Sequence, residues 1–471
     1  MQVKNSTLTF KIENFNHLIY SLTFVIAIMA SSAKAQKNIN LVRYDDNFSL
    51  LKNDSIKKGF DRMKYISLGY EKYISFGGEL REQFQLFKNI NFGDVPPGYP
   101  AINPKQLNHR LMVHANIEWG THCRYFIQLN NTLRFFNHNP AVPEIDENQL
   151  SLHQAFAELK FKKWDFRLGR QELFYGNHRL ITVREGPNTR QAFDGLVIKR
   201  ANMNGVIDFF ALTKVTSQRN VFDDQSFREG LIGIYGTQYL LNKKIGLDYY
   251  AVNFQSGIRK YNYRSGFENR QTYGLRLFSN FNRMNFEVEG AYQSGKFGNL
   301  KIDAFSILAD MNVTMFPSRK VIAGLAANTA SGDKNSADHT LSTYNLLFAK
   351  PAYGLAIPIG STNIVSIYPY VKINAVQKLN ILAQVFFLAR YSDQDGTYSP
   401  GMIENRPKPE MIFSSGRRSL GVFYVLETNY QHTKKWSFSI DASYFKAGSY
   451  PMETGKGNDI TYLSFKSAFR F

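Results

Sequence analysis

The sequence of 471 residues has one cysteine, Cys123, and no apolar run after residue 35 that is long enough to form a membrane-spanning helix. A single cysteine excludes an internal disulfide. The missing apolar run excludes a helical membrane protein, because a helix needs about 20 apolar residues to cross a bilayer. The sequence also lacks GxSxG and HExxH motifs and metal-spaced Cys and His residues. It therefore predicts no catalytic residues, no cofactor and no metal site.

The first 35 residues have the pattern of a secretory signal peptide. Two lysines precede the apolar run from Leu18 to Ala30, and small residues at positions 33 and 35 suit cleavage after Ala35. The run is short for a membrane-spanning helix, although an uncleaved N-terminal anchor is the alternative. We expect the mature chain to begin at Gln36 and to lie outside the cytoplasm.

Basic residues outnumber acidic ones, which gives the chain a formal net charge of +19 and leaves about +17 after residue 35. A basic excess favours acidic partners. For an exported protein, the expected partners are anionic polysaccharide, lipid headgroups or small anions, and nucleic acid is not expected.

Most of the chain alternates between apolar and polar residues, and aromatic residues make up 15% of it, as is typical of β-strands. In LNHRLMVHANIEW, for example, Leu111, Val113 and Ile117 fall on one face, opposite Arg110 and Glu118. About 18 such runs can be marked, at 72–87, 105–119, 123–137, 151–162, 164–172, 192–201, 205–213, 229–240, 246–254, 270–281, 284–294, 303–315, 320–329, 362–375, 379–391, 418–432, 435–447 and 459–471.

The connections between these runs alternate in length. Those after even-numbered runs are short, whereas most of those after odd-numbered runs are long, and the long set includes 88–104, 138–150, 173–191, 214–228, 255–269, 330–361 and 392–417. Alternating short turns and long loops are typical of a transmembrane β-barrel, with the turns in the periplasm and the loops outside the cell. We predict an all-β, antiparallel, up-and-down barrel of about 18 strands, with 16 as the alternative, in the bacterial outer membrane.

The barrel is predicted to span residues 72–471, after the signal peptide at 1–35 and a periplasmic segment at 36–71. That segment lacks the alternating pattern, and a position inside the lumen is its alternative placement. The last strand, ITYLSFKSAFRF, ends in an aromatic residue and resembles the signal that the barrel-assembly machinery reads. Pairing of this strand with the first one would remove both sheet edges, which lipid leaves without hydrogen bonds.

Arginines accumulate between residues 164 and 195. Strand parity turns Phe166 and Leu168 to the lipid and Arg167 to the lumen, while Arg170 must lie near the barrel rim or at a bulge. The loop 173–191 combines arginines with apolar residues and is predicted to fold into the pore. The arginines assigned to the lumen or to this loop are Arg81, Arg110, Arg134, Arg167, Arg179, Arg184 and Arg190.

Rings of guanidinium groups make a pore selective for anions, and each guanidinium binds a carboxylate in two places, which suits uronate sugars. The alternative is a structural lattice of ion pairs, because Asp165, Glu172, Glu185 and Asp194 lie close to these arginines in the sequence.

The stretches RLGRQELFYG and RLITVREGPNTRQAFDG, preceded by GGELREQFQLF and LNHRLMVHANIEWG, resemble the alginate-export family of outer-membrane barrels. The resemblance implies a monomeric, 18-stranded barrel that exports an acidic exopolysaccharide through an arginine-lined constriction. It also implies that Arg167, Arg170, Arg179, Arg184 and Arg190 contact the polymer and that Asp194 pairs with some of them.

Two other functions are compatible with the sequence. One is a narrower porin for small anionic solutes or oligosaccharides, and the other is a surface adhesin or enzyme that uses the loops 330–361 and 392–417. The stretch Asp393-Gln-Asp395-Gly396 has part of a calcium-loop pattern but lacks the downstream glutamate, which favours a simple turn.

Overall fold

The computed structural model of the protein describes residues 40–53, 59–94, 103–136, 146–261, 264–316, 321–335, 337–376, 378–406 and 416–471. The predicted signal peptide lies outside these residues. Among them, no helix combines the length and the apolar character needed to cross a membrane. The described chain is almost entirely β-structure, as the alternating sequence predicts.

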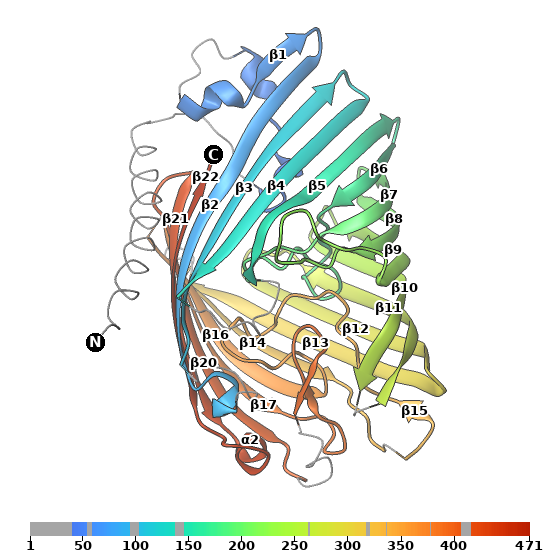
Figure 1. Cartoon of the computed structure of the whole chain (residues 1–471), viewed down its shortest axis with the longest axis vertical. Helices are drawn as coiled ribbons and strands as arrows, with labels where there is room; N and C mark the ends of the chain where they lie inside the picture. The colour runs from blue at the N-terminus through green and yellow to red at the C-terminus, as the bar shows by residue number, and fades with distance from the viewer. Residues whose placement is uncertain are drawn as a thin grey trace, which may run out of the picture.

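Eighteen strands of the described chain form a closed antiparallel barrel (Figure 1). They are β2 (Lys72–Lys88), β3 (Lys105–Trp119), β4 (Cys123–Phe135), β5 (Asn148–Phe161), β6 (Trp164–Gln171), β7 (Phe193–Asn202), β8 (Gly205–Lys214), β9 (Glu229–Leu240), β10 (Ile245–Tyr261), β11 (Arg264–Ser279), β12 (Met284–Phe297), β13 (Leu300–Phe316), β14 (Val321–Ala330), β16 (Ile364–Val376), β17 (Leu379–Ala389), β20 (Ser419–Gln431), β21 (Trp436–Ala447) and β22 (Ile460–Arg470).

The barrel closes where the first and last of these strands pair. The ladder between β2 and β22 runs from the pair Glu79 and Arg470 to the pair Lys88 and Thr461. Backbone hydrogen bonds between Gly78 and Phe471 extend it by one step, at 2.8 and 3.0 Å. The predicted closure and the count of 18 strands are therefore confirmed, and the alternative of 16 is excluded.

The two ends of the barrel differ, as predicted. Short turns lie at the end that carries β1 (Ile66–Gly69), and longer connections with β15 (Thr340–Leu341) and α2 (Ser449–Glu453) lie at the opposite end (Figure 1). Two further short strands, β18 (Thr397–Tyr398) and β19 (Glu404–Arg406), pair with each other in one of these loops.

The prediction of a long loop at 255–269 is wrong. Strand β10 continues to Tyr261 and β11 begins at Arg264, so the two form a hairpin that pairs through this region. A β-bulge between Ser256 and Arg259 shifts the register there and breaks the alternation on which the predicted strand boundary depends. Two strands can remain hydrogen-bonded where they extend out of the membrane. Their side chains can be polar there, because no lipid faces them.

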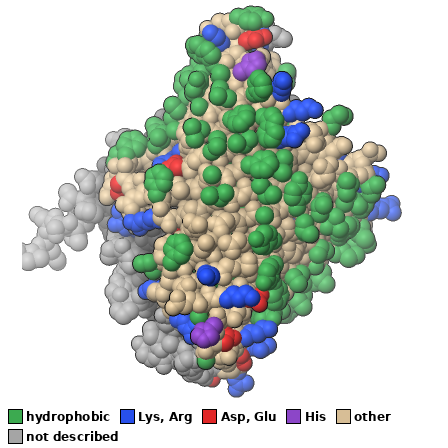
Figure 2. Space-filling model, turned by 90° about the vertical axis from the view of Figure 1, so that its right-hand side faces the viewer, with side chains coloured by type: hydrophobic (Ala, Val, Ile, Leu, Met, Phe, Trp, Pro, Cys, Tyr) green, Lys and Arg blue, Asp and Glu red, His purple; other side chains and the backbone are tan. Residues whose placement is uncertain are grey.

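The outer wall is apolar at every second residue. On β6, Phe166 and Leu168 are exposed by 38% and 64%, whereas Arg167 between them is buried. Figure 2 shows apolar side chains spread over this outer surface. The same alternation on other strands gives the barrel the lipid-facing surface that the sequence predicts.

The segment before the barrel has 3-10 turns η1 (Arg43–Asp45), η2 (Ser49–Asn53) and η3 (Gly59–Met63). Val42 and Tyr44 of this segment are buried in one apolar cluster with Phe126, Phe156 and Val183. Phe126 and Phe156 are inward residues of β4 and β5. Of the two placements considered for this segment, these contacts favour the lumen for residues 40–46.

Two paired glycines allow the barrel wall to deform where the inward loop begins. Gly169 of β6 and Gly195 of β7 are register partners with φ values of +130° and +148°. A Cβ atom on Gly169 would lie 2.2 Å from the carbonyl oxygen of Ala155 on the neighbouring strand. Only glycine fits this backbone, for both its conformation and its space.

We therefore predict that Gly169→Ala lowers the free energy of unfolding by about 1–3 kcal/mol. The measurement is the urea midpoint of the detergent-solubilised barrel. Gly290→Ala is the matched control, because a Cβ atom at that position would have no other atom within 4 Å and its φ is ordinary. Equal midpoints for the two variants would show that the contact at Gly169 is not tight.

Candidate functional site: the inward loops and the lumen chamber

The connection between β6 and β7 folds into the lumen, as the sequence predicts. Its apolar residues Leu180, Ile181 and Val183 are at most 3% exposed. Burial of such side chains is favourable, and inside a barrel it requires the loop to turn inward rather than to extend into solvent. We call residues 172–192 the first inward loop.

A second inward loop, residues 342–363, meets the first inside the barrel. Ile181 and Phe348 form a parallel bridge, and the amide of Phe348 donates to the carbonyl oxygen of Leu180 at 3.1 Å. The amide of Lys350 donates to the carbonyl oxygen of His178 at 3.0 Å. Phe348 also packs edge-on against Phe193, with ring centroids 5.3 Å apart. The two loops thus form one packed unit across the lumen.

A network of ion pairs fixes the first inward loop to the barrel wall. Arg110 of β3 pairs with Glu185 of the loop at 2.5 Å and also with Glu79 of β2. Arg190 of the loop lies 3.0 Å from Glu172 and 3.2 Å from Glu185. Four guanidinium groups and three carboxylates make up this wall cluster: Arg81, Arg110, Arg190, Arg470, Glu79, Glu172 and Glu185.

Arg81 holds the loop mainly through its backbone. Its guanidinium donates to the carbonyl oxygens of Glu185 at 2.8 Å and Pro187 at 2.9 Å. Because this guanidinium and that of Arg110 are buried, they are structural supports of the loop in this conformation.

The wall cluster also controls the ionisation of Glu185. Burial acts to raise the pKa of this carboxyl group, but the guanidinium groups of Arg110 and Arg190 outweigh burial and lower the pKa to about 2. Glu185 is therefore ionised at any pH at which a bacterial envelope functions.

Two more predicted arginines lie on β6 and differ in their surroundings. Arg167 faces the lumen and pairs with Glu158 of β5 at 2.5 Å. Arg170 forms a bidentate pair with Asp194 of β7, at 2.7 and 2.9 Å, next to the distorted glycines. This geometry agrees with two predictions. Asp194 pairs with an arginine, and Arg170 lies at an irregular part of the wall.

The three remaining predicted arginines are scattered. Arg134 is buried on β4 and interacts electrostatically with Asp146. Arg184 donates to the carbonyl oxygens of Ala349 at 2.9 Å and Pro400 at 3.2 Å, and so ties three loops together. Arg179 lies in the first inward loop and faces the main cavity of the lumen.

That cavity, the lumen chamber, has a volume of about 1020 Å³. It extends from Asn374 and Asn380 near the short turns to Phe386 and Phe423 deeper in the barrel. Of the nine predicted site residues, Arg179 is the one that lines it within the described structure. The charged residues of its lining are Arg179, Lys350, Lys372, Lys466, Glu185, Glu289, Asp310, Glu427 and Asp441.

The chamber is therefore mixed in charge, and the expected ring of guanidinium groups does not line it in the described structure. Tyrosines engage two of its carboxylates: Tyr250 donates to Glu289 at 2.8 Å and Tyr370 donates to Asp310 at 3.0 Å. Within the described residues, the chamber's four cations have no carboxylate oxygen within 4.0 Å.

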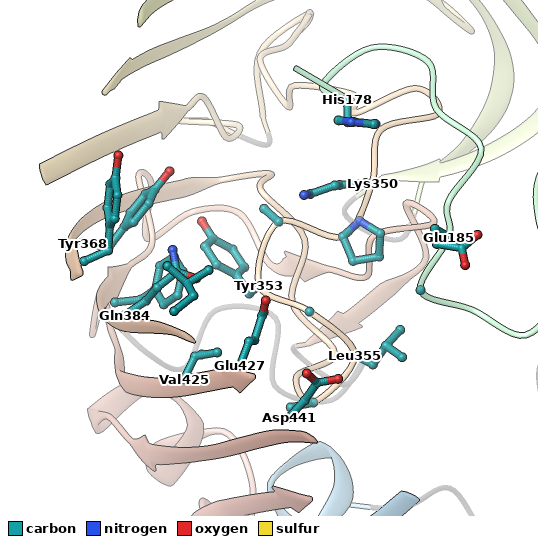
Figure 3. A pocket seen from close by; sticks show the side chains of 18 of the residues that line it. His178, Glu185, Lys350, Tyr353, Leu355, Tyr368, Gln384, Val425, Glu427 and Asp441 are labelled. Carbon is teal, nitrogen blue, oxygen red and sulfur yellow. The ribbon is translucent and has the colours of Figure 1, made fainter. Parts of the chain in front are cut away.

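Three of these cations act on one another. Burial lowers the pKa of the Lys350 ammonium; the charge of Glu427 opposes this effect, whereas Arg179 and Lys372 lower the pKa further. We call Arg179, Lys350 and Lys372 the cation trio. Figure 3 shows Lys350 and Glu427 entering the same cavity from different elements, beside Tyr353 and Tyr368.

The alternating pattern of the sequence gives no role to Lys350. Lys350 follows an apolar stretch of the second inward loop, and no strand parity applies to it. The apolar residues Leu346, Leu347 and Phe348 were the signal that this loop also folds inward.

The stretch Asp393-Gln-Asp395-Gly396 is a turn in the structure. The buried carboxylate of Asp395 accepts hydrogen bonds from the hydroxyls of Thr343 at 2.6 Å and Tyr398 at 2.7 Å, and from the amide of Asp333 at 2.8 Å. This carboxylate therefore holds three loop segments together.

The closed barrel, its apolar outer wall and its internal chamber define a channel of the bacterial outer membrane. The sequence matches the family Alginate export over residues 72–461, and the chain belongs to that family. Its fold and family are those of channels rather than of enzymes. A comparison with curated proteins gave no match.

Several outer-membrane proteins of Pseudomonas aeruginosa share this fold. OccK3 (OpdO) matches with a TM-score of 0.55 and 10% identity, over 84% of this chain and 95% of that chain. OccK2 (OpdF), solved in complex with glucuronate, matches with a TM-score of 0.57 and 10% identity, over 84% and 98%. OprD matches with a TM-score of 0.56 and 9% identity, over 84% and 94%.

The lowered pKa of Glu185 predicts how stability depends on pH. A carboxyl group whose pKa is lowered by folding contributes its full stabilisation above its ordinary pKa of 4.5 and loses it as the pH falls towards about 2. The difference in unfolding free energy between wild type and Glu185→Gln should thus be constant from about pH 5 to 8 and shrink below that range.

Urea unfolding of both proteins in detergent, repeated at each pH, measures this difference. Glu71→Gln is the control, because Glu71 is exposed at the turn before β2. A difference that stays constant down to pH 2 would contradict the assigned role of the wall cluster.

Proposed function

We propose that the protein is a passive pore for anionic saccharides and that the cation trio is the point where their carboxylates bind. The single observation that supports this proposal is that Arg179, Lys350 and Lys372 face the chamber with no carboxylate oxygen within 4.0 Å among the described residues. Clustered like charges repel one another, so a bound carboxylate lowers the free energy of the site.

The remaining lining suits the other parts of a sugar. Carboxylates such as Glu427 and Asp441 accept hydrogen bonds from hydroxyl groups, and Tyr353 and Tyr368 also belong to the lining. The basic net charge of the chain also draws acidic solutes towards it. The most specific form of the proposal is export of an alginate-like acidic exopolysaccharide, which membership of the family favours.

The predicted arginines enter this proposal in two ways. Arg179 binds substrate as part of the trio, whereas Arg81, Arg110 and Arg190 position the first inward loop that carries it. Substrate contacts by Arg134, Arg167, Arg170 and Arg184 would need a conformation other than this one, because their guanidinium groups already interact with carboxylates or carbonyl oxygens of the protein.

A narrower porin for small anions is the second candidate. It is favoured by the two inward loops, which pack against each other inside the barrel. The similar fold of OccK2, solved with glucuronate, also fits a pore for single sugar acids.

Reversal potentials in planar bilayers test the charge assignment. The triple variant Arg179→Glu, Lys350→Glu, Lys372→Glu should turn an anion-selective pore into a cation-selective one, because it changes the chamber by about six charges. The matched control replaces Lys243, Lys260 and Lys301, which are exposed, by Glu and should keep the wild-type preference. A cation-selective wild type would contradict the proposal.

Blocking experiments separate the two candidates. A pore for acidic polysaccharide should be blocked by oligomannuronate at lower concentration than by glucuronate, because a longer chain reaches several cations at once. Equal block by both would favour the small-anion porin. Block by an uncharged maltodextrin at the same concentration would exclude recognition by charge.

A further inference from the structure

We infer that residues 40–46 form a displaceable plug in the lumen, and that an acidic polysaccharide chain competes with this plug for the cleft it occupies. The inference rests on the proposed function for the identity of the competitor. The plug itself follows from contacts of the N-terminal segment with the barrel interior.

The plug lies in a cleft whose cations bind it through backbone oxygens. Arg190 donates to the carbonyl oxygen of Leu41 at 2.9 Å, and Arg124 donates to that of Tyr44. The guanidinium of Arg167 stacks over the Tyr44 ring, 4.1 Å from its centroid. An oxygen-rich chain with sugar rings presents the same kinds of group to the same three arginines.

The floor of the cleft is aromatic. The Tyr44 ring packs edge-on against Phe156, with centroids 5.3 Å apart, and against Phe126 at 6.1 Å. The hydroxyl of Tyr44 donates to the carbonyl oxygen of Glu172 in the first inward loop at 2.8 Å. The plug therefore fills the space between the loop and the wall formed by β4, β5 and β6.

The plug borders two cavities. Leu41 lines the lumen chamber, whereas Tyr44 and Asp45 line a second cavity of about 140 Å³ that also contains Arg167 and Lys199. Withdrawal of residues 41–45 would join the two cavities and uncover Arg124, Arg167 and Arg190. The passage on this side of the lumen would then be wider and more cationic.

The plug is held by side chains rather than by a backbone ladder. Within the described residues 40–65, none belongs to a strand of the barrel sheet. Its attachment point is Arg43, which pairs with Asp46 at 3.0 Å and donates to the carbonyl oxygens of Gly78 and Phe471 at 3.2 and 3.1 Å. Such side-chain contacts can break without opening the barrel.

Accessibility of Val183 tests the inference. Val183 is 1% exposed and belongs to the cluster beneath the plug. In a Cys123→Ser background, Val183→Cys should react slowly with an anionic methanethiosulfonate reagent. Adding Tyr44→Ala should accelerate the reaction by about tenfold or more, because the plug loses its aromatic contacts. Oligomannuronate should accelerate it in the protein that retains Tyr44, and maltodextrin of equal length should not.

Tyr44→Phe is the matched control, because it keeps the ring and loses only the hydrogen bond to Glu172. Heat-modifiable migration on gels shows whether each variant is a folded barrel, and Val42→Ala replaces Tyr44→Ala if the latter fails to fold. Equal rates with and without the plug substitution, or rates unaffected by oligomannuronate, would overturn the inference.

The results also separate this inference from the proposed function. If the cation trio sets ion selectivity but Val183→Cys reacts at one constant rate, the pore assignment stands and the plug is rejected. If the trio has no effect on selectivity, the proposed binding point fails, whatever the reaction rate at Val183→Cys.

Discussion

The whole structure depends on the requirement that backbone N–H and C=O groups in lipid find partners within the protein. The ladder between β2 and β22 meets this requirement by closing the sheet. Closure fixes which side chains point outward at each strand position. Because these side chains face lipid, the outer wall is apolar. Closure also creates an enclosed lumen, in which polar groups and loops can pack away from lipid. The chamber and the inward loops are therefore consequences of the same constraint.

Charge inside the barrel has two separate uses. In the wall cluster, arginines and glutamates neutralise one another and hold the first inward loop in place. In the chamber, the cation trio has no carboxylate oxygen within 4.0 Å in the described part of the chain, although the charge of Glu427 acts on Lys350. The first use supports the second, because the loop anchored by Glu185 and Arg190 also carries Arg179. A buried ion network that positions a nearby charged group costs desolvation but defines the geometry of the site.

Strand positions could be predicted from the sequence because lipid demands an apolar residue at every second position, as on β6. The hairpin of β10 and β11 could not be predicted beyond Phe254, since a β-bulge between Ser256 and Arg259 interrupts the alternation. The division of arginines between wall and chamber could not be predicted. The sequence assigns both Arg110, on a strand, and Arg179, in a loop, to the interior of the pore, and only the path of the first inward loop brings Glu185 to Arg110. The role of Lys350 depends on a second loop with no strand parity.

The contact of Arg43 with the carbonyl oxygens of Gly78 and Phe471 links three parts of the chain that are far apart in sequence. Its docking place exists only after the first and last strands have met. Residues near the N-terminus would thus be the last to settle, although they are synthesised and exported first. Until then they would remain open to periplasmic proteases and chaperones. Protection of this segment from proteolysis would consequently report the moment at which the barrel is complete.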